Sequence, residues 1–149
     1  MLVALGLRRA PALDPGDWLD RSEAELFYGQ ALADQRHAAR VATWLVARGH
    51  VDRLLIQAAL LHDVGKAVAP IGLWQRIVWV IAGRVAPRRR GWLASRGGGW
   101  RALAAHQAIG AERLRAIGAE PRLAALVAGR PLPGDEHRAE LLARADDAV

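Results

Sequence analysis

Apolar side chains recur every three or four residues along most of the chain, which is the spacing that gives an α-helix one buried face. One such stripe is formed by His37, Val41, Trp44 and Leu45. Gly49 follows this stripe and is well placed to end the helix. Upstream, Ser22 and Glu25 have the spacing of a capping box, so an earlier helix is expected to begin there.

A further helix is predicted from Asp52, whose side chain can cap the first turn, to Gly65. Its buried face would comprise Leu55, Ala58, Ala59 and His62. The stretch AALLHDVGKA, residues 58–67, then forms the last turn of this helix. Its apolar run is expected to carry the adjacent His62 and Asp63 into the interior.

The second half of the chain repeats the helical period, with glycines and prolines between the stripes. One stripe, closing at Pro87, comprises Leu73, Trp74, Ile77, Val78, Ile81 and Val85. The sequence SRGGG, residues 95–99, predicts a loop before a helix over about 100–117, which Gly118 would end. Two more helices are expected, over 121–127 with proline in the first turn and from about Asp135 onward.

No segment shows a convincing period of two, and no internal repeat is present. Helices joined by short connectors imply an all-α fold, a single-domain bundle of about six to eight helices. The helical domain is expected over residues 22–149. Residues 1–21, which contain Pro11, Pro15 and Gly16, are expected to form an irregular lead-in.

The composition is that of a globular domain, with 149 residues of which 52% are hydrophobic. The absence of cysteine excludes thiol catalysis, thiolate zinc sites and a disulfide framework. In MLVALGLRRA, residues 1–10, the arginines follow the apolar residues, the reverse of a signal peptide. We therefore expect a cytoplasmic protein.

The net charge is +6, and the middle of the chain carries it unevenly. No carboxylate occurs between Asp63 and Glu112. The cationic residues in that interval are Lys66, Arg76, Arg84, Arg88, Arg89, Arg90, Arg96 and Arg101. This imbalance favours a phosphate-bearing ligand, nucleic acid or an anionic membrane surface. A set of solvated arginines explains it equally well.

Three tryptophans, Trp79, Trp92 and Trp100, flank the arginine run and suggest either a base-stacking wall or an interfacial anchor. The segment 71–90 is too short and too interrupted by polar residues to span a bilayer. It could make peripheral membrane contact. A buried helix that covers the active site is the favoured interpretation.

Four side chains from three predicted helices are suited to a divalent metal ion: His37, His62, Asp63 and either Asp146 or Asp147. Imidazole and carboxylate without sulfur suit manganese, magnesium, iron, cobalt or nickel. Asp63 is the most informative of these residues. A buried carboxylate at the negative end of a helix is costly unless a cation is present. A metal ion would account for its position.

These residues resemble the pattern of the HD-domain superfamily of metal-dependent phosphohydrolases, a first histidine, a His-Asp doublet one helix later and a final aspartate. The pattern maps onto His37 in DQRHAARVA, onto His62 and Asp63 in AALLHDVGKA, and onto Asp146 in LLARADDAV. LLHDVGK closely matches the LLHDIGK variant. HQAIGAERL, which begins at His106, resembles the HPEIGAELL element of the same subgroup.

Two departures from the family pattern narrow what the resemblance implies. The histidine that completes a two-metal site is missing from LVAGRPLPG, and His137 within DEHR is expected to be a solvated surface residue. One divalent metal ion is therefore implied and a second is doubtful. His106 is assigned to phosphate contact or optional ligation. The absence of a GYP signature argues against cyclic dinucleotide hydrolysis.

The resemblance implies attack of a metal-activated water on a phosphomonoester or a small nucleotide. The metal would lower the pKa of that water from about 15.7 towards about 7 and polarise the phosphoryl oxygen. Asp63 would orient or deprotonate the nucleophile. Lys66 would balance charge on the phosphate, unless it only caps its helix. His106 and Arg101 would hold substrate oxygens.

Two alternatives use the same residues differently. The site could be a sensor that binds a metal or a phosphorylated ligand without turnover. The basic middle of the chain could instead be the functional face of a membrane-surface or RNA-binding module, with a vestigial His-Asp site.

Overall fold

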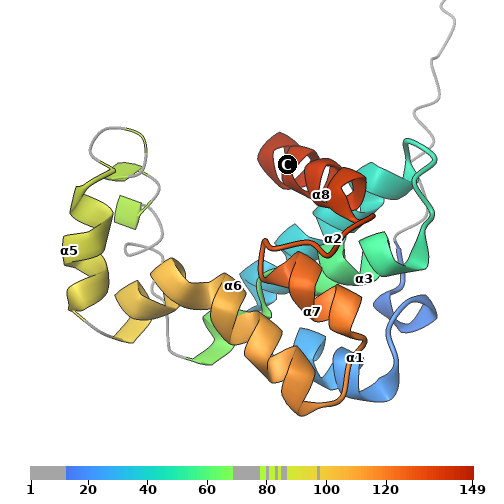
Figure 1. The fold of residues 1–149 in the computed structure, drawn as a ribbon, viewed down its shortest axis with the longest axis horizontal. Coiled ribbons are helices and arrows are strands. Elements are labelled where there is room, and N and C mark those ends of the chain that lie inside the picture. Colours follow the sequence, from blue (N-terminus) through green and yellow to red (C-terminus); the bar gives the residue numbers. More distant parts are fainter. Residues whose placement is uncertain (1–12, 69–77, 80, 83, 85–86, 97) are drawn as a thin grey trace, which may run out of the picture.

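The computed structural model describes residues 13–68, 78–79, 81–82, 84, 87–96 and 98–149 (Figure 1). These residues form an all-α bundle and contain no strand. Seven α-helices have their bounds within the described residues: α1 (Arg21–Tyr28), α2 (Leu32–Val46), α3 (Arg53–Leu61), α5 (Arg89–Ser95), α6 (Gly98–Ala116), α7 (Pro121–Val127) and α8 (Glu136–Ala148). Two 3₁₀ helices, η1 (Pro15–Asp17) and η2 (Val64–Val68), accompany them. The predicted fold class is confirmed.

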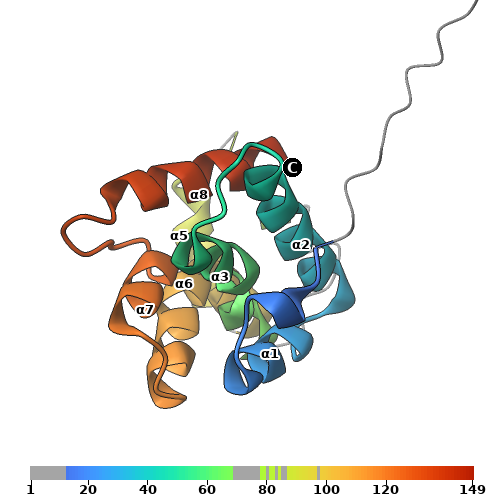
Figure 2. The same ribbon diagram turned by 90° about the vertical axis from the view of Figure 1, so that its right-hand side faces the viewer.

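Helix α3 lies at the centre of the bundle, with α8 on one side of it and α1 on the other (Figures 1 and 2). It packs against α1, α2, α7 and α8. Every residue of α3 except Arg53 and Gln57 is buried. A helix that is apolar on nearly all sides belongs in the core, so the residues that follow its last turn are delivered to the interior.

The structure corrects the start of α1. The capping box is formed by Asp20 and Glu23 rather than by Ser22 and Glu25. The Glu23 amide donates to Asp20 Oδ1 at 2.8 Å, and the Asp20 amide donates to Glu23 Oε2 at 3.0 Å. Aspartate caps helices as well as serine does, so two overlapping pairs competed and the earlier one prevailed.

The predicted helix from Asp52 to Gly65 ends early, at Leu61. His62 and Asp63 occupy a turn, and η2 follows. The reason lies in Gly65, which packs directly on the backbone of α6. A Cβ atom at this position would stand 1.8 Å from the carbonyl oxygen of His106. A regular α-helix ending in any other residue would not permit that approach.

The elements after α5 agree with expectation at most boundaries. Gly118 has φ of 76° and follows α6, proline opens α7, and α8 begins after Asp135. The loop predicted over 95–99 is partly wrong, because α6 already begins at Gly98. The arginine run lies at the start of α5. The sequence did not predict this helix, because glycines lie within it and shortly after it. The helix expected over 73–85 lies mostly outside the described residues, as does Trp74.

An ion-pair network that the sequence did not reveal holds α8 against α3 and α7. Arg138 of α8 donates from Nε to Asp52 Oδ1 at 2.8 Å, and Asp52 also caps α3. Asp135, which is fully buried, accepts from Arg122 Nε at 2.8 Å and from Arg138 Nη1 at 2.9 Å. The network sets the position of α8, and Asp146 lies about two turns beyond Arg138 along that helix.

Helix α5 stands away from the bundle beyond the start of α6 (Figure 1). It packs on α6, whose later turns rest on η2 and α7. Among the described residues, no helix combines the length and the apolar character needed to cross a membrane.

Candidate metal centre

Helix α2, the turn that follows α3 and helix α8 bring His37, His62 and Asp146 together. One ligand atom from each lies within 4.8 Å of the other two. His37 Nε2 is 2.7 Å from Asp146 Oδ1, and His62 Nε2 is 3.4 Å from the same oxygen. The imidazole rings meet edge to face, with centroids 5.5 Å apart. Asp146, and not Asp147, therefore occupies the position predicted for the last ligand.

The orientation of His62 is set by its own helix. Its Nδ1 lies 2.9 Å from the carbonyl oxygen of Ala59, and because a carbonyl only accepts, Nδ1 carries a proton. This contact turns the buried Nε2 toward Asp146 and Asp63, and Nε2 has no hydrogen-bond partner among the described residues. A histidine whose far nitrogen is held by a backbone carbonyl is the usual arrangement of a metal ligand.

The charges around His37, His62 and Asp146 favour a positive charge between these residues. Burial acts against a charge on His62, but the carboxylates of Asp63 and Asp146 outweigh it and raise the pKa of His62. The hydrogen bond with His37 and the His62 imidazole, whose Nε2 lies 3.4 Å away, hold the pKa of Asp146 well below its usual range. Positive charge is thus favoured beside Asp146, and either protons on the imidazoles or a metal ion can supply it.

Asp63 lies beside this group but is not part of it. Only 2% of its surface is exposed. Its Oδ2 accepts from Lys66 Nζ at 2.6 Å, and its Oδ1 lies 3.5 Å from His106 Nε2. Burial raises the pKa of Asp63, but the charges on His62 and Lys66 overcome that effect and lower it.

These contacts correct the reasoning that burial of Asp63 requires a metal ion, because the ammonium group of Lys66 already provides the cation. Lys66 itself was expected either to face a phosphate or to cap its helix. It lies in η2, is 18% exposed and pairs with the Asp63 side chain. The case for a metal ion therefore rests on His62, His37 and Asp146.

His106 reaches the site because η2 and α6 cross at glycines. Gly65 of η2 lies against the His106 carbonyl, and a Cβ on Gly110 would be 3.3 Å from the Gly65 amide nitrogen. Arg113 reinforces the crossing by donating from Nη1 to the Val64 carbonyl at 2.8 Å. The glycines of HDVGK and HQAIG thus bring the two motifs into contact.

A cavity of about 260 Å³ opens beside the metal-ligand candidates. It lies between α6, α7 and α8, and His62 and Asp146 form part of its wall. Its polar lining also includes Gln107 and Asp147, and the remaining residues are small or apolar: Leu126, Val127, Gly129, Ala139, Leu142 and Ala143. Sequence reasoning missed Gln107, whose only signal was its place beside His106.

The remaining predicted residues are placed as follows. The side chain of His137 is 78% exposed, which confirms it as a surface residue. The side chain of Arg101 lies outside the described part of the structure. Trp44 is partly buried against the core, with the Arg48 guanidinium 3.7 Å from its ring centroid.

The donor set fits one divalent metal ion. Two imidazole nitrogens and one carboxylate oxygen favour iron, cobalt, nickel or manganese over magnesium, which prefers oxygen ligands. The orphaned Nε2 of His62 is the observation that supports this fit. Asp146 is 45% exposed, so the group opens to solvent on its side.

No family model matches the chain, and no curated protein or solved structure matches it. Membership of the HD-domain superfamily therefore stays a prediction from the motifs.

Proposed function

We propose that this protein is a metal-dependent phosphohydrolase of the HD-domain type that cleaves a phosphomonoester or a small nucleotide. The observation that carries the proposal is the convergence of His37, His62 and Asp146 around an imidazole nitrogen that is buried and makes no hydrogen bond to any described residue. Without a metal ion, that nitrogen is either unsatisfied or protonated, whereas coordination would satisfy it.

His37, His62 and Asp146 would hold the ion. When bound, the ion would supply Lewis-acid polarisation of a phosphoryl oxygen and an activated water at neutral pH. The chain adds a second cation, because Lys66 lies next to the group through its contact with Asp63 at 2.6 Å. A bound phosphate would compete with Asp63 for this ammonium group.

Competition between the phosphate and Asp63 for Lys66 would make Asp63 a proton acceptor. When Lys66 turns to the phosphate, the Asp63 carboxylate loses its partner and becomes a better proton acceptor. Its Oδ2 lies 3.6 Å from His62 Nε2, so it would act at the edge of the metal centre. His106, 3.5 Å from Asp63 Oδ1, would steady the carboxylate or contact a substrate oxygen.

The adjoining cavity limits the organic part of the substrate. Its volume of about 260 Å³ is below the range of roughly 300–1,000 Å³ typical of sites for drug-sized ligands. A compact ester is therefore favoured over a large nucleotide. Gln107 and Asp147 would bind hydroxyl or amino groups of that ester.

A test would combine metal analysis with phosphate release on protein reloaded with manganese. The substrates would be phosphomonoesters of increasing size, phosphodiesters and nucleotides. Wild type should bind about one ion per chain and release phosphate. His62→Gln should lose both, while His137→Gln, which changes an exposed histidine, should lose neither. Equal metal content in the two variants would contradict the proposal.

A non-catalytic sensor is the second candidate, and the Lys66–Asp63 pair favours it. The pair neutralises the carboxylate that hydrolysis would use as a base. A sensor would bind the ion with the same dependence on His62 but would release no phosphate from any substrate.

A further inference from the structure

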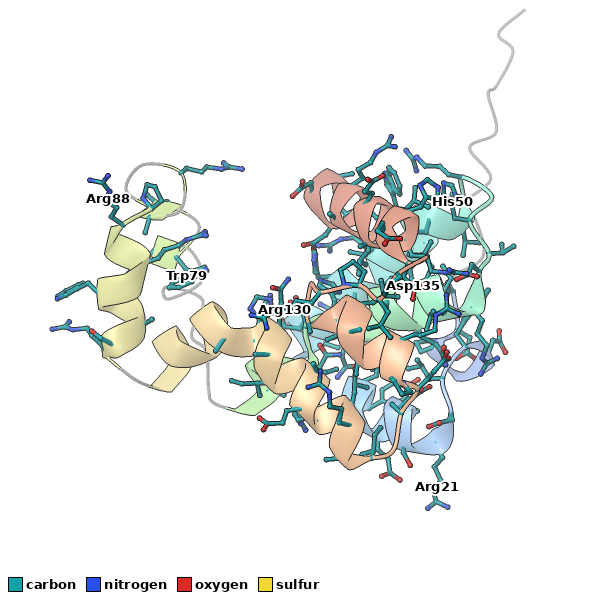
Figure 3. The ribbon with its side chains drawn as sticks, viewed as in Figure 1. Arg21, His50, Trp79, Arg88, Arg130 and Asp135 are labelled. Atoms are coloured by element: carbon teal, nitrogen blue, oxygen red, sulfur yellow. The ribbon has the colours of Figure 1, made fainter. Side chains whose placement is uncertain are left out.

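The segment that contains α5 combines positive charge with exposed apolar side chains. We call its described residues between Val78 and Arg96 the arm. Arg84, Arg88 and Arg96 are all exposed, and Figure 3 shows Arg88 pointing away from the bundle. No carboxylate occurs anywhere between residues 63 and 112 to neutralise them. The arm therefore presents a local excess of positive charge to solvent.

Two large apolar side chains lie among these arginines. Trp92 is 59% exposed and Ile81 is 55% exposed. The described core does not cover them, and they form no part of the candidate metal centre. Tryptophan beside arginine is the composition typical of a membrane–water interface, where the ring sits at headgroup level.

Arginine stacking orders the aromatic residues of the arm. The Arg96 guanidinium lies 4.6 Å from the centroid of Trp92, and that of Arg90 lies 4.9 Å from the centroid of Trp79. Arg90 also donates to the Trp79 carbonyl from Nε and Nη2, at 3.3 and 3.2 Å. One face of each ring is therefore covered. The exposed Ile81 has no ring on which a base could stack, whereas an aliphatic side chain inserts readily at a lipid interface, so the arm favours a lipid surface over RNA.

We infer that the arm docks the protein on an anionic lipid surface. Arg84, Arg88 and Arg96 contact the headgroups, and Trp92 and Ile81 insert at the interface. In Figures 1 and 2, α5 and α8 lie on the same side of α6. This inference is independent of the proposed hydrolase activity.

Vesicle sedimentation tests the inference with the full chain. One set of vesicles contains phosphatidylcholine alone, and the other also contains phosphatidylglycerol. Binding is expected only to the second set and should weaken as salt is added. Each surface arginine contributes about fivefold in affinity, so the triple change Arg84→Gln, Arg88→Gln and Arg96→Gln should weaken binding about hundredfold.

The matched control changes three exposed arginines of the bundle, Arg21→Gln, Arg40→Gln and Arg53→Gln, which alters the net charge equally. This variant should keep most of the binding. Trp92→Ala should reduce the binding that survives high salt. The inference is overturned by equal loss in the two triple variants, by equal binding to neutral vesicles, by no vesicle binding, or by single-stranded RNA that displaces the vesicles.

Discussion

Replacing Gly65 by alanine would test the crossing of η2 and α6 that delivers His106 to the site. The new methyl carbon would stand 1.8 Å from the His106 carbonyl oxygen and 2.7 Å from the Gly110 amide nitrogen. Both atoms belong to the backbone of α6, so neither can move without displacing the helix. The two segments would have to separate.

The expected change in stability can be judged by comparing alanine substitutions at three glycines with different surroundings. Overpacking costs about 1–3 kcal/mol, and contact with backbone places Gly65→Ala near the upper end, at about 3 kcal/mol. In Gly110→Ala the nearest atoms are 3.2–3.3 Å away, including side-chain atoms of Val127 and Val64. These neighbouring atoms would have to move slightly, and the cost should nearly cancel the gain of about 1 kcal/mol from the higher helix propensity of alanine, so the net change in stability should be small. Gly91→Ala, with nothing within 4 Å, should stabilise by about 0.5–1 kcal/mol.

Thermal unfolding followed by circular dichroism would measure the three variants. At about 3 °C per kcal/mol for a chain of this size, Gly65→Ala should lower Tm by about 9 °C. Gly110→Ala should change it by no more than about 3 °C, and Gly91→Ala should raise it by about 2–3 °C. If Gly65→Ala is as stable as Gly110→Ala, the close crossing does not exist and the placement of His106 beside Asp63 loses its basis.

Two further predictions concern ion pairs. Lys66→Gln leaves the Asp63 carboxylate buried without its cation and should destabilise the metal-free protein by about 2 kcal/mol in urea unfolding. The double variant Lys66→Gln with Asp63→Asn should recover part of this loss. If it recovers none, the two side chains do not interact. The hydrogen bond from Arg138 lowers the pKa of Asp52 from its ordinary value of 3.8. The Arg138–Asp52 pair therefore stabilises the fold at pH values above 3.8, and this stabilisation is lost as the pH falls through the lower pKa of Asp52 in the folded protein. The difference in unfolding free energy between wild type and Arg138→Gln should therefore be constant near neutral pH and shrink below about pH 4; a difference that grows on acidification would contradict the assignment.

Local signals were enough to predict much of the fold. The three-to-four-residue spacing predicted helices, and Gly118, Pro121 and Asp135 marked boundaries that the structure confirms. Such signals act within about one helical turn, so they are readable from neighbouring residues. The cap of α1 was misplaced by two residues because two overlapping capping pairs, Asp20 with Glu23 and Ser22 with Glu25, offer alternative starts for the same helix.

The residue types of the candidate centre were also readable, and the motif order pointed to His37, His62 and Asp146. Their convergence depends on packing, since His37 and Asp146 are 109 residues apart in the chain. The partner of Asp63 likewise depended on the turn into η2, which forms because only glycine at position 65 allows α6 to come so close. Periodicity and capping report contacts along one helix, whereas a buried charge is satisfied by whichever groups the assembled bundle places beside it. The sequence therefore determined the helices and the chemical types of the candidate ligands, and only the tertiary structure decided which of them meet.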